Sequence, residues 1–126
     1  MKFIVGGAFQ GKLDYAAKEY KVNKCDIIKG EELTENMNVE GKCLTEYHLF
    51  IKKMLLENKD PLSITEQIIE KNPNIIIMNE IGSGIIPMEK QDRIWREQVG
   101  RVGCYLAENA QTMERVICGI AVKLKG

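Results

Sequence analysis

A glycine-rich turn that ends in a lysine follows the first apolar residues of the chain. Four residues separate Gly6 from Gly11, and Lys12 comes directly after, which is the spacing of a phosphate-binding loop. The backbone of such a loop turns tightly, so that several N–H groups converge on one anion at the start of a helix. The turn therefore predicts a nucleotide site made by Gly6, Gly7, Ala8, Phe9, Gln10, Gly11, Lys12 and Leu13.

The last position of this loop departs from the pattern. A Ser or Thr hydroxyl normally stands there and binds Mg²⁺, whereas Leu13 has no oxygen to offer. Losing one charge-stabilising contact of this kind lowers a rate by roughly 10²–10³-fold. Asp14 is adjacent, but it leaves the loop in a different direction on the predicted helix. The residues thus predict phosphate binding and leave open whether the phosphate is transferred. A bare turn that joins a strand to a helix is the alternative to a site.

Polar residues also follow the most apolar run of the chain. Residues 75–78 are suited to a central parallel strand that is covered on both faces, and Asn79 and Glu80 come directly after it. Ligands of open α/β sheets bind at such strand ends, so we assign Asn79 to the nucleotide site. Glu80 is a candidate catalytic residue that could hold Mg²⁺ through water or orient an attacking hydroxyl. Alternatively, it forms a cap or an ion pair with Arg93 or Arg101.

The remaining reactive side chains give no metal or zinc pattern. His48 is the only histidine, and it lies on the apolar face of a predicted helix, which favours a buried structural role. The four cysteines contain no C-x-x-C pair, so they are expected to be reduced and partly buried: Cys25, Cys43, Cys104 and Cys118.

Apolar spacing and turn signals predict the elements that position these residues. Strands are expected at residues 3–5, 24–28, 75–78, 115–119 and 120–124. Helices are expected from Gly11, over 44–55, from Ser63 with a capping box to Glu66, and over 89–109, with a loop at 29–42. This order predicts a three-layer α/β fold with a mainly parallel sheet, in one domain over residues 1–126.

Charge and apolar content exclude several classes of partner. The 18 basic residues balance the 18 acidic ones, so no overall field attracts nucleic acid or a membrane surface. No apolar run approaches the ~20 residues of a membrane span, and no signal peptide is recognisable. We therefore expect a cytoplasmic protein.

Three blocks of the sequence resemble one known family, the bifunctional adenosylcobinamide kinase/adenosylcobinamide-phosphate guanylyltransferases. Residues 4–12 are similar to that family's Gly-Gly-Ala-Arg-Ser-Gly-Lys-Ser loop, although Phe9 and Gln10 replace Arg and Ser. Residues 79–87 and 100–102 are close to its Asn-Glu-Val-Gly-x-Gly-Ile-Val-Pro block and later Gly-Arg. Residues 118–125 look like its C-terminal end, and residues 43–45 give a fainter match.

The resemblance implies a RecA-like P-loop NTPase fold, a role in cobalamin biosynthesis, and binding of GTP or ATP. It also implies a corrinoid alcohol as phosphoryl acceptor, and a homo-oligomer, typically a trimer. Family members then transfer GMP through a histidine, but the segment that carries this histidine is missing here, so guanylyl transfer is not expected. Lys42 stands where the family has an acid. Together with Leu13, this change is expected to weaken Mg²⁺ binding.

Three functional hypotheses stay open at this point. A kinase-type transferase would use the glycines, Lys12 and the block that begins at Asn79. A non-catalytic relative would hold a nucleotide or corrinoid as a partner or regulator of another enzyme, which the changes at Leu13 and Lys42 favour. A purely structural subunit would leave the loop without a ligand.

Overall fold

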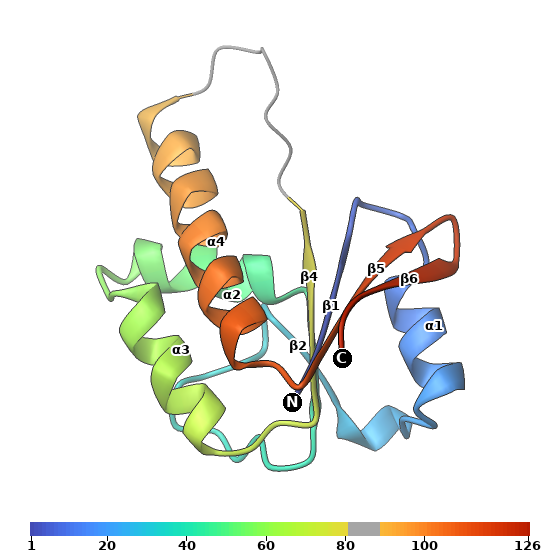
Figure 1. The fold of residues 1–126 in the computed structure, drawn as a ribbon. Coiled ribbons are helices and arrows are strands. Elements are labelled where there is room, and N and C mark those ends of the chain that lie inside the picture. Colours follow the sequence, from blue (N-terminus) through green and yellow to red (C-terminus); the bar gives the residue numbers. More distant parts are fainter. Residues whose placement is uncertain (81–88) are drawn as a thin grey trace.

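A computed structural model of the chain describes residues 1–80 and 89–126. Its described elements form one sheet with helices on both faces (Figure 1). The strands are β1 (Lys2–Gly6), β2 (Ile27–Lys29), β3 (Cys43–Thr45), β4 (Ile75–Asn79), β5 (Thr112–Ile117) and β6 (Ile120–Lys125). The helices are α1 (Lys12–Glu19), α2 (Tyr47–Leu56), α3 (Pro61–Glu70) and α4 (Lys90–Asn109), with a 3₁₀ turn η1 (Lys24–Asp26).

The sheet has the strand order β2-β3-β4-β1-β5-β6. All neighbouring strands run parallel except β5 and β6, which form an antiparallel hairpin at one edge. The predicted three-layer α/β fold with a mainly parallel sheet is therefore confirmed. Gly6 pairs with Asn79 in the register of β1 and β4. The glycine loop and the polar end of β4 consequently start from the same edge of the sheet.

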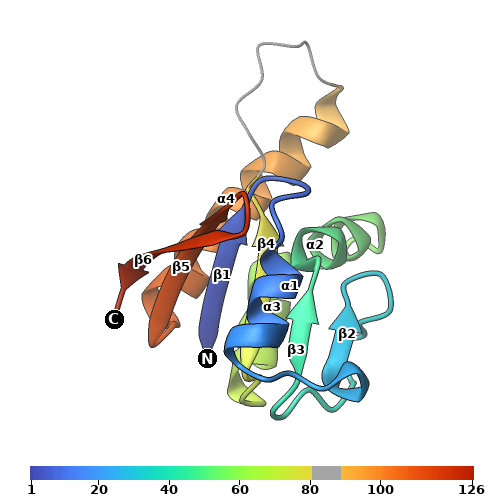
Figure 2. The same cartoon turned by 90° about the vertical axis from the view of Figure 1, so that its right-hand side faces the viewer.

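Side chains of alternating strand residues divide between two buried layers. Ile4, Ile75 and Ile77 pack with α1 on one face of the sheet. Phe3 and Ile76 pack on the other face beneath α2, α3 and α4. Figure 2, which turns the molecule by 90°, shows α1 in front of the sheet and α3 and α4 behind it. Full burial contributes about 1.5–3 kcal/mol for each such side chain, which holds the strand ends in place around the loop.

A buried carboxylate fastens α1 to the sheet. Glu114 of β5 is 7% exposed and accepts hydrogen bonds from the hydroxyls of Tyr15 and Tyr20. Burial and these hydrogen bonds raise the pKa of both tyrosine hydroxyls. The helix that begins at the end of the glycine loop is thus anchored to β5 by polar as well as apolar contacts.

The region between the first two helices differs from the prediction. Residues 24–26 form η1, and only the short β2 follows, so the predicted strand over 24–28 is wrong in its first half. Residues 43–45 form β3, an inner strand that the sequence did not reveal, and for this reason α2 begins at Tyr47 and not at residue 44. The loop before β3 is fixed by Leu33 and Val39, which are fully buried.

The start of α3 also differs. Asp60 is its N-cap and Pro61 its first residue, whereas a capping box at Ser63 was predicted. The Asp60 carboxylate accepts hydrogen bonds from the Leu62 N–H (3.3 Å) and the Ser63 hydroxyl (2.8 Å). Aspartate at the cap followed by proline is a stronger start signal than Ser63, because proline needs no N–H partner there.

Two further expectations concern the end of the chain. Helix α4 covers the predicted range, and β6 is an edge strand as predicted, with Ile120, Val122 and Leu124 exposed. Residues 81–87 of the family-like block lie outside the described residues. Among the helices of residues 1–80 and 89–126, none is both long and apolar enough to span a membrane.

Candidate nucleotide site

The glycine loop connects β1 to α1 and needs glycine at two positions. A Cβ atom on Gly6 would lie 2.5 Å from the carbonyl oxygen of Val116, so only glycine allows β1 to approach β5 this closely. Gly11 has a φ of +82° and is the residue from which α1 begins. Phe9 at the apex also has positive φ, and its side chain is fully exposed. The predicted strand–loop–helix is therefore present.

Lys12 lies under the loop and is only 8% exposed. Its Nζ donates a hydrogen bond to the Gly7 carbonyl oxygen at 2.7 Å. Burial lowers the pKa of the Lys12 ammonium, and the negative charges of Glu80 and Glu46 oppose this shift. A buried cation that is held by a carbonyl group and lacks a close carboxylate partner is a favourable place for the oxygens of a phosphate.

A cavity of about 520 Å³ opens in front of the loop. Such a volume suits a small organic ligand. Its lining comes from the carboxyl ends of neighbouring strands and from the start of α1: Ala8, Phe9, Gln10, Gly11, Lys12, Leu13, Asp14, Lys29, Thr45, Glu46, Ile77 and Asn79. The structure thus brings Asn79 and most of the predicted loop residues to one cavity.

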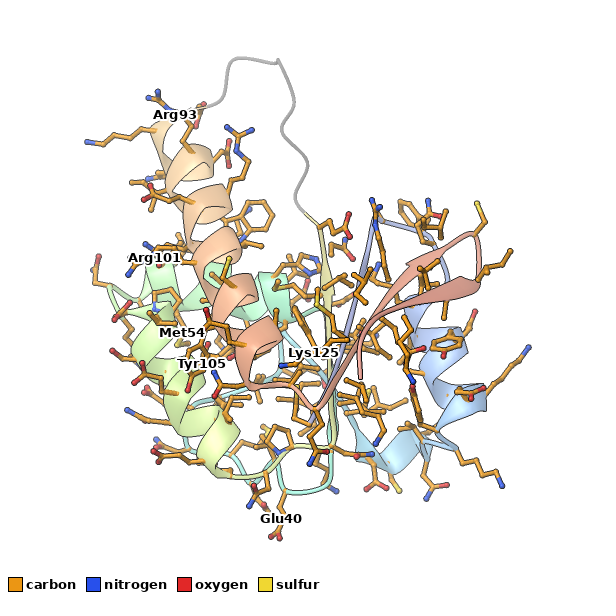
Figure 3. All side chains as sticks on the ribbon, viewed as in Figure 1. Glu40, Met54, Arg93, Arg101, Tyr105 and Lys125 are labelled. Carbon is orange, nitrogen blue, oxygen red and sulfur yellow. The ribbon has the colours of Figure 1, made fainter. Side chains whose placement is uncertain are left out.

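Glu80 does not line this cavity. Its carboxylate forms a two-pronged ion pair with Arg115 of β5, with 2.8 Å from Nε to Oε1 and 3.0 Å from Nη2 to Oε2. It borders a separate cavity beneath α4. Arg93 and Arg101, which were predicted as alternative partners, lie on α4 (Figure 3). The expectation of an ion pair is correct, but its partner is Arg115 of β5, the strand that lies beyond β1 in the sheet.

His48 is buried and holds the end of β4. Its Nδ1 accepts a hydrogen bond from the backbone N–H of Asn79 at 3.1 Å, and its carbonyl oxygen accepts one from Trp95 Nε1 at 2.8 Å. Burial, and then the nearby charge of Lys12, lower the pKa of His48 to about 4. The imidazole is therefore neutral at pH 7 and positions Asn79 beside the cavity.

Lys42 lies at the opposite end of β3 from the cavity. It precedes Cys43, the first residue of the strand, and its ammonium pairs with Asp26 at 2.9 Å. An acidic residue at position 42 would therefore not line the cavity of this chain, and the expected loss of a metal contact through Lys42 does not follow from its position.

The residues at the carboxyl end of β3 were not predicted from the sequence. Thr45 is 5% exposed and Glu46 follows it, and both line the cavity. The signal was present, since a short apolar run that ends in polar residues is the same pattern that singled out Asn79. Residues 43–45 are too few to stand out as a strand without their pairing to β4.

Gln10 ties the loop to the β5–β6 hairpin. Its carbonyl oxygen accepts a hydrogen bond from the Gly119 N–H at 2.8 Å, and its side-chain Oε1 accepts one from the Cys118 N–H at 2.7 Å. Cys118 and Gly119 both have positive φ, as in the two-residue turns that close twisted hairpins. Nothing in the sequence indicates this contact, because the two segments are separated by over a hundred residues.

Fold and site together define a P-loop protein of the α/β class, with residues 8–13 of the loop and the polar ends of β3 and β4 around one cavity. The chain belongs to the cobinamide kinase / cobinamide phosphate guanyltransferase family, whose family model matches residues 33–124. The matched range includes the ends of β3 and β4 and the hairpin. The glycine loop lies before it, so the loop is assigned from its spacing and its geometry.

Two curated relatives share a shorter segment with the chain. Both are named bifunctional adenosylcobalamin biosynthesis protein CobU, one from Escherichia coli K12 and one from Salmonella typhimurium LT2. Each is 39% identical over 51 residues, which is 40% of this chain and 28% of the relative. The shared segment thus spans less than a third of either relative.

Proposed function

We propose that the chain binds ATP or GTP in the cavity and transfers the terminal phosphoryl group to the alcohol of a corrinoid in cobalamin biosynthesis. The observation that carries this proposal is the buried ammonium of Lys12 beneath a loop of glycine-rich backbone. Membership of the cobinamide kinase family supports the reaction type and the acceptor.

The chain's own groups have defined roles in this proposal. Loop N–H groups and Lys12 bind the β- and γ-phosphates, while Asn79 lies at the polar end of β4. The acceptor oxygen attacks the γ-phosphorus, and the bond from that phosphorus to the bridging oxygen breaks as the new O–P bond forms. The nucleoside diphosphate leaves, and the hydroxyl proton passes to a base or to solvent. Positioning and charge stabilisation supply most of the rate in such transfers.

Mg²⁺ fits the donor set of the cavity even though Leu13 supplies no oxygen. Asp14, Thr45, Glu46 and Asn79 line the same space and all carry oxygen atoms, the ligands that Mg²⁺ prefers. When bound, the ion would neutralise the charge that develops on the phosphates.

Guanylyl transfer is not part of the proposed function. His48 is the single histidine, and its Nδ1 is occupied by the Asn79 N–H. A neutral, buried imidazole that holds backbone is poorly suited to carry a covalent nucleotide.

A binding protein without turnover is the second candidate. Leu13 favours it, because the loop hydroxyl that binds Mg²⁺ is absent. Such a relative would bind the nucleotide or the corrinoid as a partner or regulator of another enzyme.

A homo-oligomer is also proposed. Ile117 pairs with Ile120 across the hairpin, and Val122 lies on the same face two residues further on. All three are exposed, at 45%, 69% and 47%, an apolar surface of the kind that marks interfaces between chains. Light scattering of the purified protein tests this, since a monomer at all concentrations would contradict it.

Titration calorimetry with ATP and GTP, followed by transfer of labelled phosphate to cobinamide, tests the main proposal. Binding together with transfer supports the kinase, and binding without transfer supports the second candidate. No binding of either nucleotide would contradict the kinase, and no binding of cobinamide in addition would contradict the second candidate.

A further inference from the structure

Glu46 is an acidic residue of the cavity that the phosphate-loop pattern does not explain. It follows β3 directly, lines the cavity with Lys12 and Asn79, and is solvent-exposed. It takes part in none of the ion pairs formed within residues 1–80 and 89–126. Its negative charge, like that of Glu80, opposes the lowering of the Lys12 pKa by burial.

The backbone at Glu46 adopts a conformation that few side-chain-bearing residues adopt. Its φ is +54° and its ψ is +42°, in the left-handed region. Strain of this kind costs on the order of 1–3 kcal/mol and persists where surrounding contacts fix it. Here the strained residue faces a ligand-sized cavity.

Gly30 is one of the contacts that fix this conformation. Its N–H donates to the Thr45 carbonyl oxygen at 2.8 Å, and a Cβ atom on Gly30 would lie 2.0 Å from the Glu46 carbonyl oxygen. That same carbonyl oxygen accepts the Leu49 N–H at 3.0 Å at the start of α2. The position of Glu46 is therefore determined by two neighbouring elements and by the absence of a side chain at residue 30.

The other acidic residues near the loop are less suited to a metal. Asp14 borders the cavity but is shared with a second pocket along α1, which it lines with Lys18 and Glu19. The Glu80 carboxylate forms an ion pair with Arg115 and borders the cavity beneath α4. Of the two carboxylates that line the cavity of the loop, Glu46 is the one that is not shared with the pocket along α1.

We propose that Glu46 is the carboxylate that holds the Mg²⁺ of the bound nucleotide, with the Thr45 hydroxyl beside it as a second oxygen. This proposal rests on the proposed nucleotide site. In this assignment, residues at the end of β3 supply the side-chain oxygen for Mg²⁺ that Leu13 lacks. No cluster of three or more metal-binding side chains exists in the described part of the chain, but nucleotide-bound Mg²⁺ takes only one or two carboxylates and completes its shell with phosphates and water.

The test measures metal and nucleotide binding, not turnover. Calorimetry with ATP or GTP, in excess Mg²⁺ and in EDTA, is compared for wild type, Glu46→Gln, Glu46→Asp and the control Glu40→Gln. Glu40 is an exposed carboxylate at the end of the molecule opposite the cavity (Figure 3). The further change in the Mn²⁺ resonance signal when protein is added to a mixture of Mn²⁺ and nucleotide, compared with the same mixture without protein, reports metal bound in the protein complex.

Wild type and Glu40→Gln are expected to bind nucleotide more tightly with Mg²⁺ than without it. In Glu46→Gln, the increase in nucleotide affinity caused by Mg²⁺ should be at least about tenfold smaller than in wild type. Without metal this variant should bind nucleotide as tightly as wild type or more tightly, because a charge that repels phosphate is gone. Glu46→Asp keeps the carboxylate, so Mg²⁺ should again increase its nucleotide affinity, although by less than in wild type.

Two results would overturn the assignment of Glu46. One is a Glu46→Gln variant in which Mg²⁺ increases nucleotide affinity, and protein changes the Mn²⁺ resonance signal, as much as in wild type. The other is nucleotide affinity of the wild-type protein that does not depend on Mg²⁺. If nucleotide binds and Lys12→Met weakens it, these results remove the role of Glu46 and leave the proposed function intact. If wild type binds no nucleotide at all, both proposals fall.

Discussion

The side-chain oxygen of Gln10 accepts a hydrogen bond from the backbone N–H of Cys118 at 2.7 Å. This contact joins the phosphate loop to the turn of the β5–β6 hairpin, and the Gly119 N–H adds a second bond to the Gln10 carbonyl oxygen. One residue thus holds the loop through both its backbone and its side chain. The exposed apolar residues of the hairpin lie on the element that this contact connects to the site.

We expect Gln10→Met to lower nucleotide affinity by about three- to tenfold. Methionine keeps the length of the side chain but removes the acceptor, and one neutral hydrogen bond contributes about 0.5–1.5 kcal/mol. NMR of labelled protein checks the cause, since nucleotide should shift the Cys118 amide signal in wild type and not in the variant, whereas Gly119 keeps its bond to the backbone of residue 10. Affinity equal to wild type in Gln10→Met would show that the hairpin contact does not position the loop.

Gly30→Ala is predicted to destabilise the protein by about 1–3 kcal/mol, the cost of forcing atoms into a packed site. The added methyl group would meet the Glu46 carbonyl oxygen and the Phe50 N–H. Urea unfolding measures the change. Gly41→Ala is not a suitable control because of its positive φ, so Gly100→Ala serves instead: its Cβ meets nothing within 4 Å, and alanine within α4 should keep or raise the stability by up to about 1 kcal/mol. Equal stability of the two variants would contradict the close approach at Gly30.

Acid should destabilise the fold through His48. Its pKa is lowered to about 4 in the folded state, against about 6.5 when unfolded, so the unfolded chain binds more protons between these values. The stabilisation is therefore complete above pH 6.5 and is lost as the pH falls toward 4, by on the order of 2–3 kcal/mol. Urea unfolding of wild type and His48→Asn over this range measures it.

His48→Asn should flatten this pH dependence, because asparagine does not titrate and can still accept the Asn79 N–H. Nucleotide affinity at pH 7 should stay within about threefold of wild type. The same acid sensitivity in both proteins would assign the effect to another group. Complete loss of activity in His48→Ala, with the fold intact, would contradict a structural role.

Glu80→Gln distinguishes the two roles considered for that residue. The pair with Arg115 is partly exposed, so its loss should cost only about 0–1 kcal/mol in unfolding experiments. Because Glu80 borders the other cavity, we expect any phosphate transfer to fall by less than about tenfold, whereas loss of a catalytic acid or base costs roughly 10²–10⁴-fold. Kinetics of the variant decide between them.

The sequence predicted the parts of the site that follow from local pattern. The glycine spacing located the loop, and the β-branched run at residues 75–78 located β4 and its polar end at Asn79. The order of strands and helices predicted from apolar spacing was enough for the α/β class. These features depend on neighbours in the chain, so they can be read without knowing the fold.

What the sequence did not reveal depends on contacts between distant segments. β3 has three residues and is stabilised by its pairing with β2 and β4, so its local signal is weak. Without β3, Thr45 and Glu46 could not be placed at the cavity. The partner of Glu80 likewise follows from β5 lying beside β1, and the role of Gln10 follows from the hairpin reaching the loop.

Lys12 is the residue on which the proposed nucleotide site depends most directly. Calorimetry with ATP and GTP should show that Lys12→Met lowers affinity by about 10- to 100-fold, since a charged hydrogen bond to phosphate contributes about 1.5–3 kcal/mol. Methionine retains an apolar stem in this buried position, and Lys18→Met on the exposed face of α1 is the matched control. Affinity that falls in Lys12→Met alone is the predicted result. Nucleotide binding that is equally strong in wild type, Lys12→Met and Lys18→Met would contradict the site.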